Sequence, residues 1–156
     1  MPQAGLKWPN DLVAGGAKLG GVLVETRREE RATLAVIGVG VNYRNAAELR
    51  RRLRRRIASL DELCVPLPSR NDIIRRTALA LLEAVDAFES RGLDAVREDW
   101  EAMDAHAGQR LRVRLADGRV LTGVAAGLTE DGGLQLRTRG GVRAVRSGRV
   151  ISSRAA

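Results

Sequence analysis

The stretch LVAGGAKLGGVLVE, residues 12–25, decides the fold of the first part of the chain. Two apolar segments flank Gly15-Gly16, and such a two-residue glycine turn predicts a β-hairpin. Gly20-Gly21 interrupts the second strand, which indicates a bulge or a close approach of the backbone to a ligand. Lys18 lies among these glycines, but the spacing does not match the GxxxxGK[ST] pattern of a P-loop. The alternative is an ordinary glycine hairpin with an exposed lysine.

The segment KWPND, residues 7–11, precedes this hairpin. Pro9 fixes a turn, and a residue before proline is pushed into an extended conformation, which here applies to Trp8. Asn10 and Asp11 follow with an amide and a carboxylate that suit a phosphate group or its metal. The alternative is a turn whose polar side chains are simply solvated.

The segment after the hairpin is Ala32 to Val41, which is almost entirely apolar and β-branched. Such a composition predicts a strand buried on both faces, entered through a charged turn at 26–31. Gly38 and Gly40 weaken the packing of this strand unless a ligand, or a neighbouring helix, needs the space. Asn42 ends it, where ligand groups often lie in open α/β sheets.

Helices are predicted for the middle of the chain. The basic stretch 46–56, which contains RRRLRRR at 50–56, favours a helix in a mobile segment. After the stiff linker 65–68, Ser69 and Asp72 resemble a capping box at the start of a long amphipathic helix. Arg91-Gly92 ends this helix, and a shorter helix follows to about residue 103.

From Gly108 the apolar period changes to two. Leu111, Val113 and Leu115 alternate with arginines, and Asp117-Gly118 predicts a hairpin turn. Five short strands separated by glycine-containing turns predict a small SH3-like β-barrel. The predicted fold class is therefore α+β: a partial mixed sheet with helices over residues 1–106, followed by the barrel over residues 107–156.

The composition says less than the motifs about which functions are possible. The formal net charge is +8, which allows an anionic partner. Lys7 and Lys18 are the only lysines among the 27 basic residues, a skew typical of GC-rich coding, so the arginine excess is weak evidence for nucleic acid binding. A compact ammonium suits sites that a planar guanidinium does not fit. The single cysteine, Cys64, fits a reducing cytoplasm, and no apolar run is long enough for a transmembrane helix.

Taken in order, residues 7–11, 16–25 and 38–42 resemble the biotin protein ligase family, whose catalytic domain carries KWPND, GxKLxGxLxE and GxGxN motifs. The resemblance continues through Trp100 to Asp104. It also covers 123–136, which is similar to a glycine pattern of the family's C-terminal domain. Each motif is modest alone, but the ordered set is specific.

The resemblance implies a ligase that uses ATP to form biotinoyl-AMP and then acylates a lysine of a biotin carboxyl-carrier domain. By this resemblance Lys18 is the catalytic residue, because it matches the lysine that contacts the biotin carboxylate and the adenylate phosphate. The implied biotin-binding residues are Lys18, Gly21, Leu23, Gly38 and Val41. The implied ATP-binding residues are Lys7, Asn10, Asp11 and Asn42, with Asp11 near an ATP-bound Mg²⁺.

The sequence also departs from the family. The GRGRxGRxW segment, which closes over biotin and adenylate, would precede Lys7 and is not found in the 156 residues; neither is a helix-turn-helix DNA-binding domain. We therefore expect a sheet with exposed apolar faces and unpaired edges, which invite a partner chain or a homodimer. We expect this chain by itself to have no biotinylation activity, an expectation that turnover of a carrier domain would contradict.

Two other functions fit parts of the sequence. The basic run 50–56, the barrel and the high pI favour a nucleic-acid-binding module, although no aromatic residues are interleaved with that run. A remnant that docks a carrier domain without binding ATP is the third interpretation. His106, the only histidine, is predicted to be a cap or a surface residue.

Overall fold

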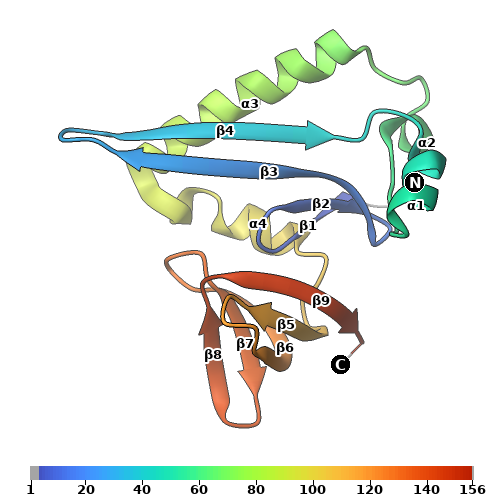
Figure 1. Cartoon of the computed structure of the whole chain (residues 1–156). Coiled ribbons are helices and arrows are strands. Elements are labelled where there is room, and N and C mark those ends of the chain that lie inside the picture. Colours follow the sequence, from blue (N-terminus) through green and yellow to red (C-terminus); the bar gives the residue numbers. More distant parts are fainter. Residues whose placement is uncertain (1–3, 156) are drawn as a thin grey trace. The chain divides into compact units, whose positions relative to one another are not determined.

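The computed structural model describes residues 4–155 and divides into two compact units (Figure 1). The first contains the residues up to Leu6 and Asn10–Pro68; the second contains Lys7–Pro9 and the chain from Ser69 onward. The chain therefore leaves the first unit for three residues of the KWPND segment and then returns to it. The domain boundary predicted between residues 106 and 107 stays a prediction.

The first unit is built on a four-stranded sheet in the order β1 (Ala4–Lys7), β2 (Asp11–Ala14), β3 (Ala17–Arg28) and β4 (Thr33–Val41). The pairs β2–β3 and β3–β4 are antiparallel, so the predicted mixed sheet is wrong for these strands. The physical reason is that both connections are short hairpins, which can join only antiparallel neighbours. One isolated parallel bridge joins Lys18 to Ile57.

The glycine hairpin is confirmed. Gly15 and Gly16 have φ of 55° and 71°, and two positive φ values in a two-residue loop match the twist of the strands they join. A bulge is confirmed as well, because Leu12 pairs with Gly20 while Val13 pairs with Lys18. Leu19 is the extra residue, and it points into a small core.

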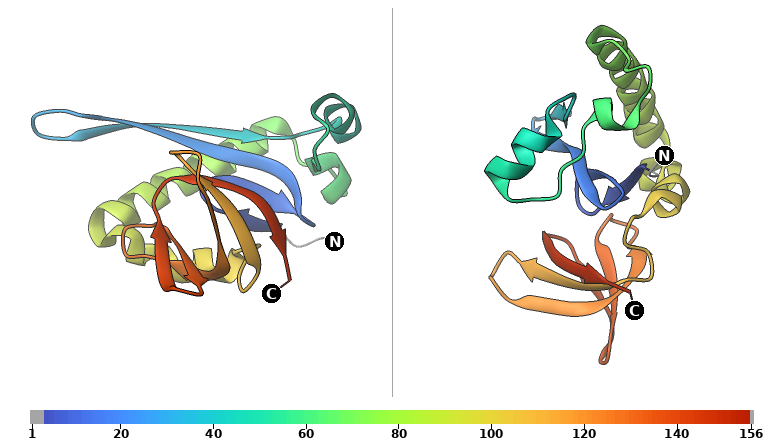
Figure 2. Two further views of the ribbon diagram at one scale, coloured as in Figure 1. Left: turned by 60° about the horizontal axis from the view of Figure 1, so that its bottom comes forward. Right: turned by 90° about the vertical axis from the view of Figure 1, so that its right-hand side faces the viewer.

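The β3–β4 ribbon differs from the prediction in length and burial. Strand β3 continues to Arg28, and a hydrogen bond from the Glu29 amide to Ala32 closes the turn. Strand β4 is not buried on both faces, since Leu34 is 52% and Val36 61% exposed. The apolar sequence of β4 favours burial, but burial also requires another element that covers the strand. Leu34 and Val36 are left uncovered, so the exposed apolar face that we expected is present. Figure 2 shows the ribbon extending past β1 and β2.

Two short helices, α1 (Ala46–Leu53) and α2 (Leu60–Leu63), follow the sheet. The predicted helix in the basic stretch is thus confirmed for its first part. Between the helices, Ile57, Ala58 and Ser59 are buried. Ala58 joins Ala14 and Leu19 in the core of this unit, so the segment after the arginine run packs against the start of β3.

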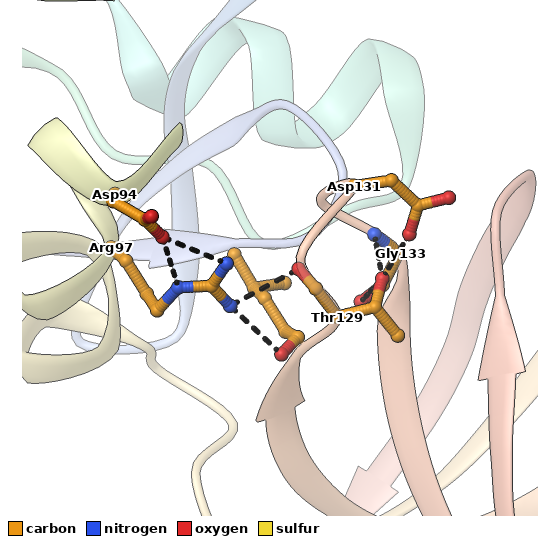
Figure 3. A network of polar contacts seen from close by, with 6 residues as sticks. Asp94, Arg97, Thr129, Asp131 and Gly133 are labelled. Atoms are coloured by element: carbon orange, nitrogen blue, oxygen red, sulfur yellow. Dashed lines mark hydrogen bonds and ion pairs between the residues drawn. The ribbon is translucent and has the colours of Figure 1, made fainter. Parts of the chain in front are cut away.

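The second unit begins with the long helix α3 (Arg70–Arg91), the 3-10 turn η1 (Gly92–Ala95) and α4 (Arg97–Met103). The predicted cap is confirmed, because the Ser69 hydroxyl accepts a hydrogen bond from the Asp72 amide. Arg97 holds α4 in place: its guanidinium contacts Asp94 and donates to the carbonyl oxygens of Leu128 and Thr129 at 3.1 Å each (Figure 3). Among the described residues, no helix is both long and apolar enough to span a membrane.

The five predicted C-terminal strands are confirmed. They are β5 (Arg110–Leu115), β6 (Val120–Leu128), β7 (Leu134–Thr138), β8 (Gly141–Val145) and β9 (Gly148–Arg154), in the sheet order β8-β7-β6-β5-β9. The described pairings leave β8 and β9 as edges, so the strands form an open antiparallel sheet and the barrel is not confirmed. Its core includes Leu111, Leu134 and Leu136, with Trp8 of the KWPND segment packed among them.

His106 gives the second unit a pH-dependent stability. It is half-buried, its Nδ1 has no partner among the described residues, and burial lowers its pKa, while the nearby Asp104 opposes this shift. The unfolded chain therefore takes up a proton first as the pH falls through about 6.5. We expect the free energy of unfolding to be highest above that pH and to decline below it.

Denaturant unfolding of the wild type and of His106→Gln at pH 7.5 and pH 5.5 measures this decline, which the variant should largely lose. Asp104 acts in the opposite sense, because burial raises its pKa and the folded state gains the proton first. Asp104→Asn removes that contribution and serves as the control. Equal pH dependence of the wild type and His106→Gln would contradict the assignment.

Candidate functional site

An open cavity of about 650 Å³ lies in the first unit along β3 and β4. Its walls are mostly glycine and valine, with three polar residues at one end. The lining residues are Asn10, Lys18, Gly20, Gly21, Val22, Leu23, Gly38, Val39, Gly40, Val41 and Asn42. Residues of all three sequence motifs thus meet in one cavity.

The strand register shows how the cavity is formed. Gly21 pairs with Gly40, and Leu23 pairs with Gly38. Directly opposite residues project to the same face, so three of these four positions have no side chain above the sheet. A Cβ on Gly40 would meet no atom within 4 Å, whereas a Cβ on Gly21 would lie 3.5 Å from both the Lys18 Nζ and the Asp11 Oδ1. The bare strip of backbone therefore ends at a charged pair.

That charged pair is Lys18 and Asp11. The Lys18 ammonium donates to the Asp11 carboxylate, and the lysine side chain remains 49% exposed. A ligand can thus reach the cation, which is fixed in position by its carboxylate partner.

The backbone of Lys18 is held by the segment that follows α1. Its amide donates to the Arg56 carbonyl at 3.0 Å, and its carbonyl accepts from the Ala58 amide at 2.9 Å. The Arg56 guanidinium also donates to the Gly15 carbonyl at 3.0 Å. We call these contacts of Arg56 and Ala58 with Lys18 and Gly15 the Arg56 clamp. The sequence motifs did not predict it, because Arg56, the last residue of the basic run, bonds to a turn 41 positions earlier.

Asn42 serves the same clamp. Its side-chain amide donates to the carbonyls of Lys18 and Ala58, both at 3.1 Å. Its main chain is bonded as well, donating to the Leu19 carbonyl and accepting from the Leu60 amide. The structure therefore brings Asn42 to the cavity, with both amide hydrogens engaged in holding the lysine's backbone.

The other residues implied by the resemblance lie in different surroundings. Asn10 lines the cavity, and its carbonyl accepts from the Val22 amide at 2.9 Å. Val41 also lines the cavity but packs against the core of Ala14, Leu19 and Ala58. Lys7 belongs to the second unit. Among the described residues, no cluster of three or more His, Cys, Asp or Glu could hold a metal ion.

A pair of glycine variants tests the close approach of the two strands at Gly20. A Cβ on Gly20 would lie 2.4 Å from the Gly40 carbonyl oxygen, which is backbone and cannot turn aside. We expect Gly20→Ala to lower the free energy of unfolding by about 1–3 kcal/mol, as overpacking does, in denaturant titrations.

Gly40→Ala is the matched control on the paired strand, because its methyl group would enter open space. We expect its free energy of unfolding to stay within about 0.5 kcal/mol of the wild type. Equal destabilisation by the two alanines would show that the close approach at Gly20 does not matter.

Comparisons with known proteins agree with this arrangement. Residues 3–42 match the model of the biotin/lipoate A/B protein ligase family, and residues 106–152 match that of the biotin protein ligase C-terminal domain. The two matches define the class of protein as a biotin/lipoate-type protein ligase with a biotin protein ligase C-terminal domain.

The relatives refine the class. The biotin--[acetyl-CoA-carboxylase] ligase of Mycobacterium tuberculosis is 34% identical over 152 residues, which cover 97% of this chain and 54% of the relative. The bifunctional ligase/repressor BirA of Bacillus subtilis is 27% identical over 147 residues, covering 93% and 45%. A structure of the Aquifex aeolicus biotin protein ligase in complex with biotin and ATP superposes with a TM-score of 0.79 at 25% identity, covering 98% of this chain and 62% of that one.

This chain belongs to the biotin protein ligase family. It spans about half the length of the curated relatives that it matches. These matches cover both units, so a nucleic-acid-binding module in place of a ligase is not favoured.

Proposed function

We propose that the cavity is the biotinoyl-adenylate site of an ATP-dependent biotin protein ligase. The observation that supports this best is the Lys18 ammonium at the end of a side-chain-free strip of two paired strands. In biotin activation a carboxylate oxygen attacks the α-phosphate of ATP and pyrophosphate leaves, so two anionic groups must approach each other. A fixed cation at that point stabilises the charge that builds up there.

Asp11 positions this cation. The carboxylate holds the ammonium beside Gly21, where an incoming acyl-phosphate oxygen would replace it as the partner of Lys18. No covalent protein intermediate is needed, since the residues bind, orient and stabilise charge. We infer that Lys18 is the catalytic residue in this sense.

The strip beside Lys18 suits the biotin ring system. Gly21, Gly38 and Gly40 leave room above the sheet, and Leu23 supplies apolar surface at the far end. We assign Gly21, Leu23, Gly38 and Val41 to biotin, and Lys7, Asn10, Asp11 and Asn42 to the nucleotide. Mg²⁺ usually binds through one or two carboxylates plus substrate phosphates, so the single carboxylate of Asp11 fits an ion carried by ATP. Such an ion would neutralise phosphate charge.

The acceptor would be a lysine of a biotin carboxyl-carrier domain, and the cytoplasm is the expected compartment. The cavity is open and its neighbours Leu23, Leu34 and Val36 are exposed, so water has free access to a bound adenylate. An adenylate needs a site that excludes water. We therefore propose that this 156-residue chain by itself binds the intermediate without transferring biotin, and that the unpaired edge of β4 accepts a partner strand, such as that of a second copy.

Calorimetric titration with a non-hydrolysable biotinoyl-AMP analogue tests the proposal. We expect saturable one-to-one binding that biotin displaces, and no biotin transfer to a purified carrier domain. A carrier-docking remnant would instead bind the carrier domain and ignore the analogue, and that result would overturn the proposed function.

A further inference from the structure

The C-terminal sheet has a strongly one-sided charge. Strands β5 to β9 contain seven arginines, three of them in β5, and no acidic residue. Composition alone explains why these residues are arginine instead of lysine. It does not explain why every acidic residue of this region lies in a turn, outside the strands.

The register places six of the seven arginines on the outward face. Leu111 and Val113 point into the core, so Arg110, Arg112 and Arg114 of β5 project outward. Their direct neighbours in β9 include Arg154, opposite Arg110, and Arg149, opposite Arg114. On the other side the row continues from Arg110 through Val124 to Arg137 of β7. We call these six residues the arginine face: Arg110, Arg112, Arg114, Arg137, Arg149 and Arg154.

Some arginines elsewhere in the chain have acidic partners. Arg75 and Arg76 share Asp72, Arg119 contacts Asp117, and Arg146 contacts Asp131. None of the six guanidinium groups of the arginine face has a hydrogen-bond or ion-pair partner among residues 4–155. The face is therefore an uncompensated positive surface.

This arrangement opposes stability. Like charges directly opposite each other on neighbouring strands repel, and the sheet has two such pairs, Arg110–Arg154 and Arg114–Arg149. The arginines of β5 follow one another at about 6.8 Å, the rise of two residues, and adjacent strands are about 4.8 Å apart. An anionic partner with closely spaced charges would relieve this repulsion.

A cavity on the same surface adds hydrogen-bond donors. It measures about 590 Å³, and its lining includes Arg110, Arg137 and Arg139 together with Thr122. Thr138 lines it as well, but its hydroxyl already donates to the Gly141 carbonyl. Guanidinium groups bind phosphate with two parallel hydrogen bonds, and hydroxyls and main-chain amides are the other common phosphate contacts. The cavity is thus suited to a phosphate group of a longer chain.

We propose that the arginine face binds the phosphate backbone of duplex nucleic acid without reading its sequence. Binding cores between proteins are depleted in charge and centred on large apolar or aromatic anchors. The apolar residues of β6 that pair with this face are two valines, Val120 opposite Arg114 and Val124 opposite Arg110, which are small for such anchors. No aromatic side chain lies in β5 to β9, so bases have nothing to stack on, which disfavours single strands. The arginine face is in the second unit and shares no residue with the ligase cavity.

Fluorescence anisotropy of the full chain with labelled 20–30-base-pair duplexes tests this, using two unrelated DNA sequences and one RNA duplex. If all six arginines contact phosphates, the plot of log affinity against log salt should have a slope of about −5, or about a 10³-fold loss from 50 to 200 mM salt. The triple variant Arg110→Gln, Arg112→Gln, Arg114→Gln should reduce that slope to about −3. The two DNA sequences should bind equally, and the RNA arm tells whether both duplex geometries are accepted.

Arg75→Gln, Arg76→Gln, Arg119→Gln is the matched control, because it removes three charges that are already paired. Arg51→Gln, Arg52→Gln, Arg54→Gln removes three from the basic helix α1 and its C-cap instead. The slope should change little in both. An equal reduction of the slope in either variant would show that net charge, and not the arginine face, binds the duplex. Binding of the chain to an acidic carrier domain but not to duplexes would assign the face to a protein partner. Each of these results overturns the proposal. Arg149→Gln, Arg154→Gln repeats the test on β9 if the first variant does not fold.

Discussion

Lys18→Gln is expected to weaken binding of the biotinoyl-AMP analogue by about 100-fold, since losing a charge-assisted hydrogen bond costs about 2–3 kcal/mol and each 1.4 kcal/mol is tenfold. The structure makes this variant informative. The bonds that hold residue 18 in place come from its own amide and carbonyl, which donate to Arg56 and accept from Ala58 and Asn42. Exchanging the side chain leaves that clamp intact, so affinity should fall while the unfolding midpoint stays unchanged.

Arg27→Gln is the matched control for Lys18→Gln. It removes one positive charge from the same strand, at an exposed ion pair with Glu29, and neither residue lines the ligase cavity. Its affinity for the analogue should equal that of the wild type. Lys18→Arg should recover only part of the loss, because a planar guanidinium cannot replace a compact ammonium at a single point. Unchanged affinity in Lys18→Gln would remove Lys18 from the proposed mechanism.

The features that the sequence predicted well are local ones. The Gly15-Gly16 hairpin and the Ser69 cap depend on residues within a few positions of each other, and so does the turn at Asp117-Gly118. The nearness of Gly21 and Gly38 in the cavity could also be inferred from the sequence, because the two glycines lie on strands joined by one hairpin. For such features the chain's own geometry leaves few alternatives.

The features that the sequence missed depend on distant parts of the chain. The predicted burial of β4 was wrong, because a strand is covered by another element, which the strand's own residues do not specify. The Arg56 clamp joins residues 41 positions apart, and the pairing of Arg110 with Arg154 joins residues 44 positions apart. The alternation of apolar residues and arginines in β5 was visible in the sequence, but only the register shows that β9 and β7 add arginines to the same surface.

The neighbours of Trp8 also lie far away in the sequence. The sequence predicted an extended conformation for Trp8 but not the residues that it contacts. Trp8 is only 5% exposed and packs in the core of the C-terminal sheet with residues such as Leu111 and Leu136. Its indole Nε1 donates to the Gly132 carbonyl, 124 positions later, at 3.2 Å. One part of the KWPND segment thus stabilises the second unit, while Asn10 and Asp11 serve the cavity of the first.

Trp8→Ala is therefore expected to lower the free energy of unfolding of the second unit by about 3–5 kcal/mol, the usual cost of deleting a buried aromatic side chain. The loss combines the cavity left among the leucines with an unpaired carbonyl at Gly132. Trp8→Phe keeps most of the volume and should cost clearly less, whereas Val142→Ala, at an exposed position of the same sheet, should stay within about 0.5 kcal/mol. Hydrogen exchange of the Leu111, Leu134 and Leu136 amides reads the second unit separately from the first. If these amides exchange as slowly in Trp8→Ala as in the wild type, the tryptophan does not support this core, and KWPND would have to be explained by the cavity alone.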